Sequence, residues 1–394
     1  MKRRPLRRLG AVPLLTATVV ALVLSGCSSA SSGSSNGGGD VNQAAVDKAD
    51  AALKALEGQV LSTGPNGEAA SSVDEVQLTD AQLAQVQAMG AKAAIVMHYG
   101  GNDWSTAQVD GLQSEFKRLG IQVVATTDAD FKPEQQVSDI ETVMTQNPNV
   151  IVSIPTDPVA TASAYRAAAQ AGAKLVFMDN VPDGFKAGQD YVSMVSADNY
   201  GNGVVSAHLL ARSLGGTGKV GVIYHNADFF VTKQRYDGFK KTVEDQYPDM
   251  QIVADQGIAG PDFAGDAQAA ANAMLSQHPD LDAIWAVWDV PAEGVLAAAR
   301  AAGRTDLKVA TQDLGLNVAI ALAKNELVVG LGAQRPFDQG VTEARLAALS
   351  LLGQPTPAYV ALPALPVDHE NVLDAWKQVY HSDPPSTLAD SYKD

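Results

Sequence analysis

The stretch AAIVMH at residues 93–98 opens a series of short, continuous apolar runs that determine the fold class of this chain. Three more follow at 121–126 (IQVVAT), 149–154 (NVIVSI) and 173–178 (AKLVFM). A run without polar alternation is typical of a strand covered on both faces, and therefore of a parallel sheet between layers of helices. The spacing leaves room for one helix between consecutive strands, so the pattern predicts a doubly wound α/β unit.

A second series repeats this pattern after residue 218. Its apolar runs are KVGVIY at 219–224, QIVAD at 251–255, DAIWAV at 282–287, LKVAT at 307–311 and LVVGL at 327–331. The sequence therefore predicts two doubly wound parallel-sheet lobes in tandem. In such sheets ligands bind at the carboxyl ends of the strands, so the residues after each run are the candidate site.

Helix starts are predicted where a capping residue precedes an amphipathic segment. Residues 41–90 are expected to form a helical N-terminal extension, with one helix over 41–60 and another ending near Gly90. The predicted caps are Thr79 with Gln82, Ser105 with Gln108, and Asp157 before Pro158.

The first forty residues indicate export. A basic start is followed by an uncharged stretch from Leu9 to Leu24 and then by Cys27, the only cysteine in the sequence. The uncharged stretch is short for a membrane span, which needs about 20 residues. We interpret residues 1–26 as a lipoprotein signal peptide, Cys27 as the acylated residue, and the Ser/Gly-rich residues 27–40 as a tether. The expected location is the outer face of the cell membrane, with either Sec or twin-arginine export.

The charge balance disfavours nucleic acid as a partner. The chain has 28 Lys and Arg against 44 Asp and Glu, a formal net charge of −16, and five of the cations precede residue 9. A chain this acidic, with no basic run after its start, lacks the positive surface that phosphate backbones and anionic lipids require. Contact with a membrane is therefore expected through the lipid anchor only.

Carboxylates, amides and indoles recur where the predicted strands end. Such groups hydrogen-bond vicinal hydroxyls, and aromatic faces lie against the C–H face of a sugar ring. His98 and His225 also follow strands, although a hydrogen-bonded or solvated histidine is the more frequent role. The other strand-end residues are Asn102, Asp103, Trp104, Asp179, Asn180, Trp288, Asp289, Asp313 and Gln334.

From about residue 91 to 380 the chain resembles the type I periplasmic sugar-binding proteins that feed ABC importers, the ribose- and galactose-binding group. The order and spacing of seven segments carry this resemblance. They are IVMHYGGNDWS (95–105), VFMDNVP (176–182), VSADNYGNG (195–203), TKQRYDGF (232–239), IWAVWDVPAEG (284–294), TQD (311–313) and GAQRPFDQG (332–340).

The resemblance implies two lobes joined by a three-strand hinge near Ala197, Gln334 and Leu362, which close over a solute. Lobe 1 would comprise residues 91–197 and 335–361, and lobe 2 residues 198–334 and 362–394. The resemblance also implies which residues bind the ligand. In the first lobe they are Asn102, Trp104 and Asp179, with their neighbours Asp103 and Asn180. In the second lobe and hinge they are Lys233, Trp288, Asp289, Asp313 and Gln334.

Three departures from the ribose-binding pattern narrow the expected ligand. Asn180 and Lys233 stand where that pattern has arginines, and Trp288 replaces an amide. Because lysine lacks the rigid fork with which arginine holds two hydroxyls, the expected ligand is another monosaccharide, a sugar alcohol or a short polyol.

No enzyme motif accompanies these features. The six histidines show neither His-x-His nor His-Glu-x-x-His spacing, and Gly-x-Ser-x-Gly is missing. We therefore expect no catalysis, no metal and no cofactor, but a monomeric solute-binding protein that delivers its ligand to an ABC permease. The alternative is a sugar or polyol sensor whose ligand-bound form signals to a membrane kinase.

The lipoprotein interpretation yields a direct prediction. Because Cys27 is the only thiol that can be acylated, Cys27→Ser is expected to release the protein from washed membranes into the soluble fraction. Immunoblots of the two fractions measure this, with Ser28→Ala as a matched neighbour that stays membrane-bound. Retention of Cys27→Ser in the membranes would contradict the interpretation.

Overall fold

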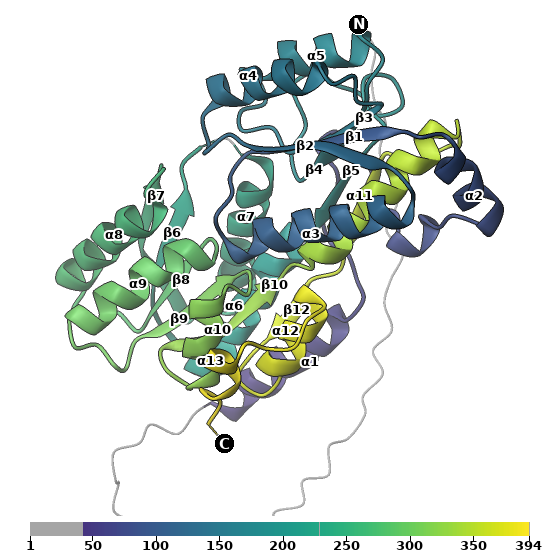
Figure 1. Ribbon diagram of the computed structural model, residues 1–394. Helices are drawn as coiled ribbons and strands as arrows, with labels where there is room; N and C mark the ends of the chain where they lie inside the picture. Colours follow the sequence, from purple (N-terminus) through teal and green to yellow (C-terminus); the bar gives the residue numbers. More distant parts are fainter. Residues whose placement is uncertain (1–41, 228, 394) are drawn as a thin grey trace, which may run out of the picture. The chain divides into compact units, whose positions relative to one another are not determined.

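The computed structural model describes residues 42–227 and 229–393, so the predicted signal peptide, Cys27 and tether lie outside the described residues. Both predicted lobes are present, each built around a sheet with helices on its faces (Figure 1). Across the described ranges no helix is long and apolar enough to cross a membrane.

The first sheet has the strand order β11-β5-β4-β3-β1-β2, and all its pairs are parallel. β1, β3 and β4 are buried almost throughout, as their continuous apolar runs predicted, and so is β5. For β2 the prediction of burial on both faces is wrong, because β2 is the edge strand and remains partly exposed. The strands are β1 (Lys92–Met97), β2 (Gln122–Asp128), β3 (Val150–Ser153), β4 (Lys174–Met178), β5 (Ser193–Ala197) and β11 (Tyr359–Leu362); the helices are α3 (Asp103–Arg118), α4 (Pro133–Met144), α5 (Ala162–Gln170) and α11 (Pro336–Leu351).

The second sheet has the order β12-β10-β9-β8-β6-β7, in which only β12 runs antiparallel. Its strands are β6 (Gly218–His225), β7 (Met250–Ile258), β8 (Ala283–Ala286), β9 (Lys308–Gln312), β10 (Val328–Ala333) and β12 (Leu365–Val367). Its helices are α6 (Asn199–Leu214), α7 (Phe230–Gln246), α8 (Phe263–Gln277), α9 (Asp289–Ala301), α10 (Leu316–Ala323), α12 (Val372–Tyr380) and α13 (Ser386–Ala389). Each of the nine apolar runs coincides with a strand, which confirms the predicted two-lobe α/β class.

The chain passes between the two sheets three times. It leaves the first sheet after β5, returns after β10, and leaves again between β11 and β12. The first and third crossings lie side by side, because the backbone N–H of Asp198 donates to the carbonyl of Leu362 at 2.8 Å.

Helix starts followed the predicted caps only in part. The Thr79–Gln82 capping box is confirmed at the start of α2 (Asp80–Ala88). The Ser105 cap is wrong, because α3 begins two residues earlier and the Asn102 side chain accepts from the Ser105 N–H. The Asp157 cap is also wrong: its carboxylate accepts from the N–H groups of Val159 and Ala160 in a turn, and α5 starts only at Ala162.

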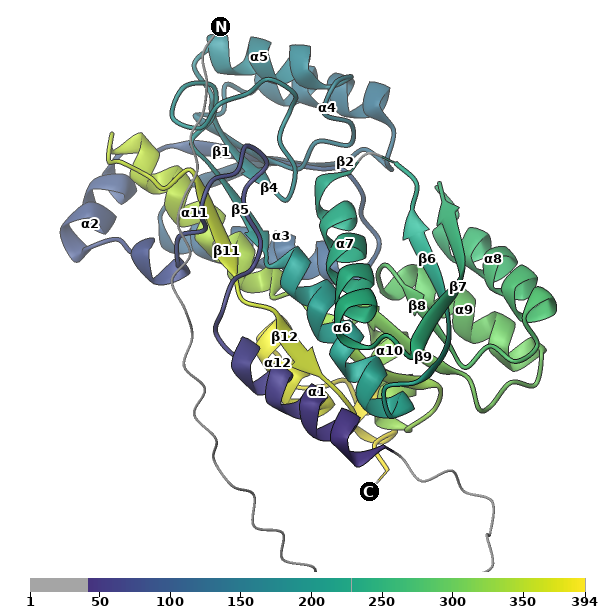
Figure 2. The ribbon, with the colours of Figure 1, turned by 180° about the vertical axis from the view of Figure 1, so that it is seen from behind.

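The segment before β1 contains α1 (Gln43–Leu56), a 3₁₀ turn η1 (Val73–Glu75) and α2. α1 packs on α6 through Ala49 and Leu53, whereas Val76 and Val86 pack into the first lobe. Figure 2 shows this segment running from α1 past β11 towards α2.

Helices α3 and α11 cross at close range in the first lobe. A Cβ added to Gly111 would lie 2.2 Å from the carbonyl oxygen of Phe337, and one added to Gly340 would lie 2.4 Å from that of Gln108. Since these contacts are to backbone, the helices would have to separate to admit any side chain.

Gly111→Val is therefore expected to lower the free energy of unfolding by about 1–3 kcal/mol, the usual effect of overpacking. Chemical denaturation of the variant and the wild type measures the difference. Ser114→Val, on the exposed side of the same helix, is the matched control and should change stability by about 0.5 kcal/mol or less. Equal stability of both variants would show that α3 and α11 do not pack this closely.

Candidate ligand-binding site

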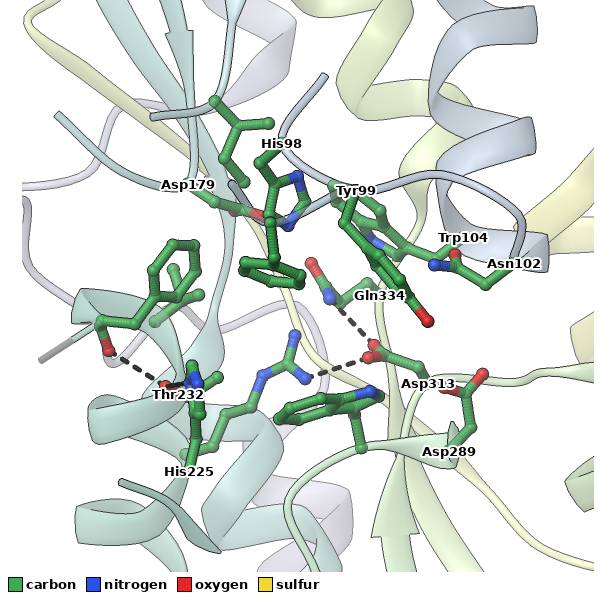
Figure 3. A pocket seen from close by; sticks show the side chains of 16 residues that line it. His98, Tyr99, Asn102, Trp104, Asp179, His225, Thr232, Asp289, Asp313 and Gln334 are labelled. Carbon is green, nitrogen blue, oxygen red and sulfur yellow. Dashed lines mark hydrogen bonds and ion pairs between the residues drawn. The ribbon is translucent and has the colours of Figure 1, made fainter. Parts of the chain in front are cut away.

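A cavity of about 70 Å³ lies between the two lobes, at the ends of strands from both sheets. Polar side chains and aromatic rings both line it (Figure 3), and we call its rings the aromatic wall. Its lining residues are His98, Tyr99, Asn102, Trp104, Phe131, Ile154 and Asp179 of the first lobe and His225, Phe229, Val231, Thr232, Arg235, Trp288, Asp289, Asp313 and Gln334 of the second lobe and hinge.

Asp179 and Asp313 occupy equivalent places in the two lobes. Each follows a buried strand, β4 or β9, and each has a positive φ, 51° and 63° respectively. Non-glycine residues rarely adopt this conformation, and it recurs at binding sites where surrounding contacts hold it in place. Both carboxylates line the cavity with most of their surface buried.

Asp313 is held by two donors. Arg235 Nη1 donates to its Oδ2 at 2.9 Å, and Gln334 Nε2 donates to its Oδ1 at 2.8 Å. Asp179 accepts from the Ser196 hydroxyl at 2.6 Å. Burial raises the pKa of Asp179 to about 6, against the lowering effects of Ser196 and the Arg235 charge.

The cation of the cavity is Arg235 rather than Lys233, which corrects the sequence-based expectation. The Lys233 side chain is 64% exposed and pairs with Asp237 on the surface of α7. Arg235 lies on the buried side of the same helix and donates from Nε to Asn199 Oδ1 at 2.8 Å and from Nη1 to the Val287 carbonyl at 3.3 Å. The cavity therefore has a guanidinium whose position is fixed on three sides.

Asn102, Trp104, Trp288 and Gln334 all line the cavity, as the sequence analysis anticipated. Asn102 also caps α3 through its side-chain oxygen. The indole N–H of Trp104 and the side-chain oxygen of Gln334 are buried without a hydrogen-bond partner. These two groups are a free donor and a free acceptor for a bound solute.

Asp289 lines the cavity at the first turn of α9, whereas Asp103 and Asn180 do not line it. Asp103 Oδ2 accepts from the Leu316 N–H of the other lobe at 2.7 Å, so it joins the lobes beside the cavity. Asn180 is buried and donates to the Pro155 carbonyl at 3.1 Å. Asp103 and Asn180 therefore support the site from outside its lining.

Three rings of the aromatic wall, those of Tyr99, Phe131 and Phe229, were not predicted as site residues. The Phe131 ring packs edge-on against His98, with 4.7 Å between ring centroids. The Tyr99 ring lies 5.1 Å from the Phe131 ring. From the other lobe, Phe229 stacks with His98 at 5.9 Å. Phe131 and Phe229 lie in loops outside the apolar runs. The one sequence signal for them was their place shortly after a predicted strand.

Both strand-end histidines line this wall, and His225 Nδ1 is also hydrogen-bonded with the Thr232 hydroxyl at 3.2 Å. Burial lowers the pKa of His98 to about 3, with the nearby His225 adding to the effect, and burial lowers that of His225 to about 4. Both rings are therefore uncharged at neutral pH and act as partly polar, flat surfaces. Over the described ranges no group of three His, Cys, Asp or Glu side chains is placed to hold a metal ion.

Comparisons with known proteins agree with this geometry. The family model described as a periplasmic binding protein domain matches residues 92–355. The ribose import binding protein of Salmonella typhimurium is 26% identical over 268 residues, 67% of this chain and 86% of that protein. That of Bacillus subtilis is 28% identical over 226 residues, 57% and 70% of the two chains.

Solved structures give the same result. An ABC sugar transporter subunit from Rhodobacter sphaeroides superposes with a TM-score of 0.64 at 28% identity, covering 72% of this chain and 99% of that one. A solute-binding protein from Agrobacterium vitis with bound allitol has a TM-score of 0.65 at 25% identity, covering 73% and 98%. One from Mycobacterium smegmatis with bound glycerol has a TM-score of 0.65 at 26% identity, covering 72% and 96%.

Proposed function

Because the chain belongs to the type I periplasmic sugar-binding proteins of ABC importers, we propose that it captures a monosaccharide or sugar alcohol between its lobes and delivers it to an import permease. The observation that carries this proposal is the pair Asp179 and Asp313, which face one cavity from equivalent strand ends of the two lobes. The protein is a binding protein and not an enzyme, in keeping with its relatives.

The polar groups and the aromatic wall of the cavity both suit a polyhydroxylated solute. Carboxylates accept hydrogen bonds from hydroxyl groups, and the free Gln334 oxygen and Trp104 N–H add one acceptor and one donor. The rings of Phe131, Phe229 and Trp288 offer flat apolar surface for the C–H face of a sugar or the carbon chain of a polyol. The allitol and glycerol bound by structural neighbours support this ligand class.

Binding is expected to be coupled to closure of the lobes. The lining comes from both lobes, so only an arrangement in which they meet can contact the solute on all sides. The lobes are joined at three crossings, and small dihedral changes there can separate them while each sheet stays intact. The contact from Asp103 to the Leu316 N–H is one that opening would break.

The location and assembly follow from the family and the N-terminal sequence. Periplasmic binding proteins act outside the cytoplasm, and we propose that a lipid on Cys27 holds this one as a monomer at the outer face of the membrane. The permease would then receive solute from a protein tethered beside it.

The proposed site can be tested by comparing two cations on one helix. A thermal-shift screen of the purified protein against pentoses, hexoses and four- to six-carbon polyols identifies the ligands that bind the folded state. Arg235→Lys is expected to weaken binding of the strongest of them by about 10- to 150-fold, because a charged hydrogen bond is worth about 1.5–3 kcal/mol. Isothermal calorimetry measures the affinity.

Lys233→Ala, two residues away on the exposed face, is the matched control and should bind within about twofold of wild type, as surface positions do. The reverse pattern, with Lys233→Ala impaired and Arg235→Lys normal, would restore the original assignment of Lys233. No shift with any sugar or polyol would contradict the proposed function itself.

A further inference from the structure

The charges that line the cavity are unbalanced. Three carboxylates, those of Asp179, Asp289 and Asp313, face a single guanidinium, that of Arg235. Arg235 is paired with Asp313 at 2.9 Å. His98 and His225 add no positive charge at neutral pH, because burial holds their pKa values low. Asp179 and Asp289 therefore have no cation of their own.

The surroundings of Asp289 make its charge costly to bury. Its Oδ1 accepts from the neighbouring Val290 N–H at 2.8 Å. The charged groups around it are the carboxylates of Asp313, Glu293 and Asp103, and burial together with these charges raises its pKa well above the usual value. A buried carboxylate among other carboxylates is stabilised either by a proton or by a cation that enters with the ligand.

The hydrogen-bonding groups of the cavity also favour a ligand with several donors. Gln334 is 3% exposed and its Oε1 has no donor, whereas the buried indole N–H of Trp104 has no acceptor. The carboxylates of Asp179, Asp289 and Asp313 add acceptor oxygens to the lining, so acceptors outnumber this one unpartnered indole donor. An ammonium group supplies three donors and no acceptor, whereas each hydroxyl supplies one donor and also needs donors itself.

The aromatic wall also suits a positive charge. Tyr99, Phe131 and Trp288 line the cavity, and aromatic faces attract cations when these are withdrawn from water. Figure 3 shows Tyr99 and Asn102 on the same side of the cavity as Asp289 and Asp313. This part of the site therefore combines acidic groups with aromatic surface.

We propose that the preferred solute carries one protonated amino group among its hydroxyls, as an amino sugar or amino polyol does, with Asp289 as the residue that selects the charge. The inference rests on the proposed function, since it specifies the ligand class of the same cavity.

Calorimetry on the full protein with matched ligand sets tests the proposal. The probes are D-glucitol with 1-amino-1-deoxy-D-glucitol, D-glucose with D-glucosamine and N-acetyl-D-glucosamine, and the best neutral ligand of the screen with its amino-deoxy counterparts. At least one amino compound is expected to bind tenfold or more tightly than its neutral parent. The N-acetyl compound, which keeps the nitrogen without the charge, should show no such gain.

Asp289→Asn should reduce this preference, the ratio of the amino compound's affinity to that of its neutral parent, to less than threefold. Asp183→Asn, the same substitution at an exposed position of the first lobe, should retain the full preference. Neutral parents that bind as tightly as the amino compounds in every set would overturn the charge proposal while leaving the proposed function standing. Failure of every probe, neutral and amino alike, would overturn both.

A second inference rests on the segment before β1, residues 42–91, which precedes the part matched by the family model. We call it the strap. Its α1 lies on the second lobe, where Ala49 packs with Ala207, Leu210 and Ala211 of α6. Its later part lies on the first lobe, where Val76 packs with Val195 and Val360.

Between these anchors the strap is hydrogen-bonded to the first crossing and to β11, the strand that precedes the third crossing. Asp198, directly after β5, accepts from the N–H groups of Leu61 and Ser62 and from the Ser62 hydroxyl at 2.7–2.8 Å. Ser71 then adds to the outer edge of β11, donating to the Tyr359 carbonyl at 3.0 Å and accepting from the Ala361 N–H at 3.3 Å. The strap is therefore a fourth connection between the lobes, made while they meet over the cavity.

The geometry points to the strap as a restraint that favours the closed arrangement of the lobes. Cutting it should release the restraint without removing either anchor. A protease recognition sequence inserted between Asn66 and Gly67, in an exposed turn, allows the cut to be made after folding. The same insertion between Ala171 and Gly172, in an exposed turn within the first lobe, is the control.

Small-angle scattering of the uncut and cut proteins, without any added solute, measures the separation of the lobes. The radius of gyration is expected to increase after the cut at residue 66 and to stay unchanged after the cut at residue 171. A radius that does not change at either site, or changes equally at both, would overturn the restraint. Circular dichroism confirms that both cut proteins keep their secondary structure.

Discussion

Parallel strand pairing is the constraint on which the rest of this structure depends. In a parallel sheet every strand ends at the same edge, so residues far apart in sequence are brought together without any direct attraction between them. Here that edge of the first sheet contributes Asp179, and that edge of the second contributes Asp289 and Asp313. Because the chain crosses between the sheets three times, the two edges are held facing one another.

The second constraint is the cost of taking charges out of water. The Arg235–Asp313 pair is nearly fully buried, and such a pair is tolerated only when its remaining hydrogen-bonding groups are satisfied. Asn199, the Val287 carbonyl and Gln334 satisfy them here. This network fixes a charged wall against which a solute can be oriented, and Asp179 and Asp289 stand beside it without a cation of their own.

The strap links the binding cavity to the movement of the lobes relative to one another. The same Asp198 that caps α6 through the Gly201 N–H also holds the strap beside the hinge. A protein of this family is expected to work by changing the angle between its lobes, so a segment bonded to both lobes and to the first crossing would act on the equilibrium between open and closed lobes. The strap lies outside the residues that the family model matches.

The amino-acid sequence by itself determined the fold class, because continuous apolar runs at a regular spacing are compatible with little else than buried parallel strands. It also placed Asn102, Trp104, Asp179, Trp288, Asp313 and Gln334 at strand ends or the hinge, where the structure has them lining the cavity.

Only the tertiary structure decided between Lys233 and Arg235. Residues two apart on a helix point in nearly opposite directions, about 200° around its axis, so an error of two positions exchanges a buried side chain for a solvated one. Among the described residues, Phe229 stands at the start of α7 without a capping side-chain hydrogen bond, so it did not mark the start that sets this phase. The aromatic wall likewise depended on packing between the lobes, since Phe131 and Phe229 meet only when both sheets are in place.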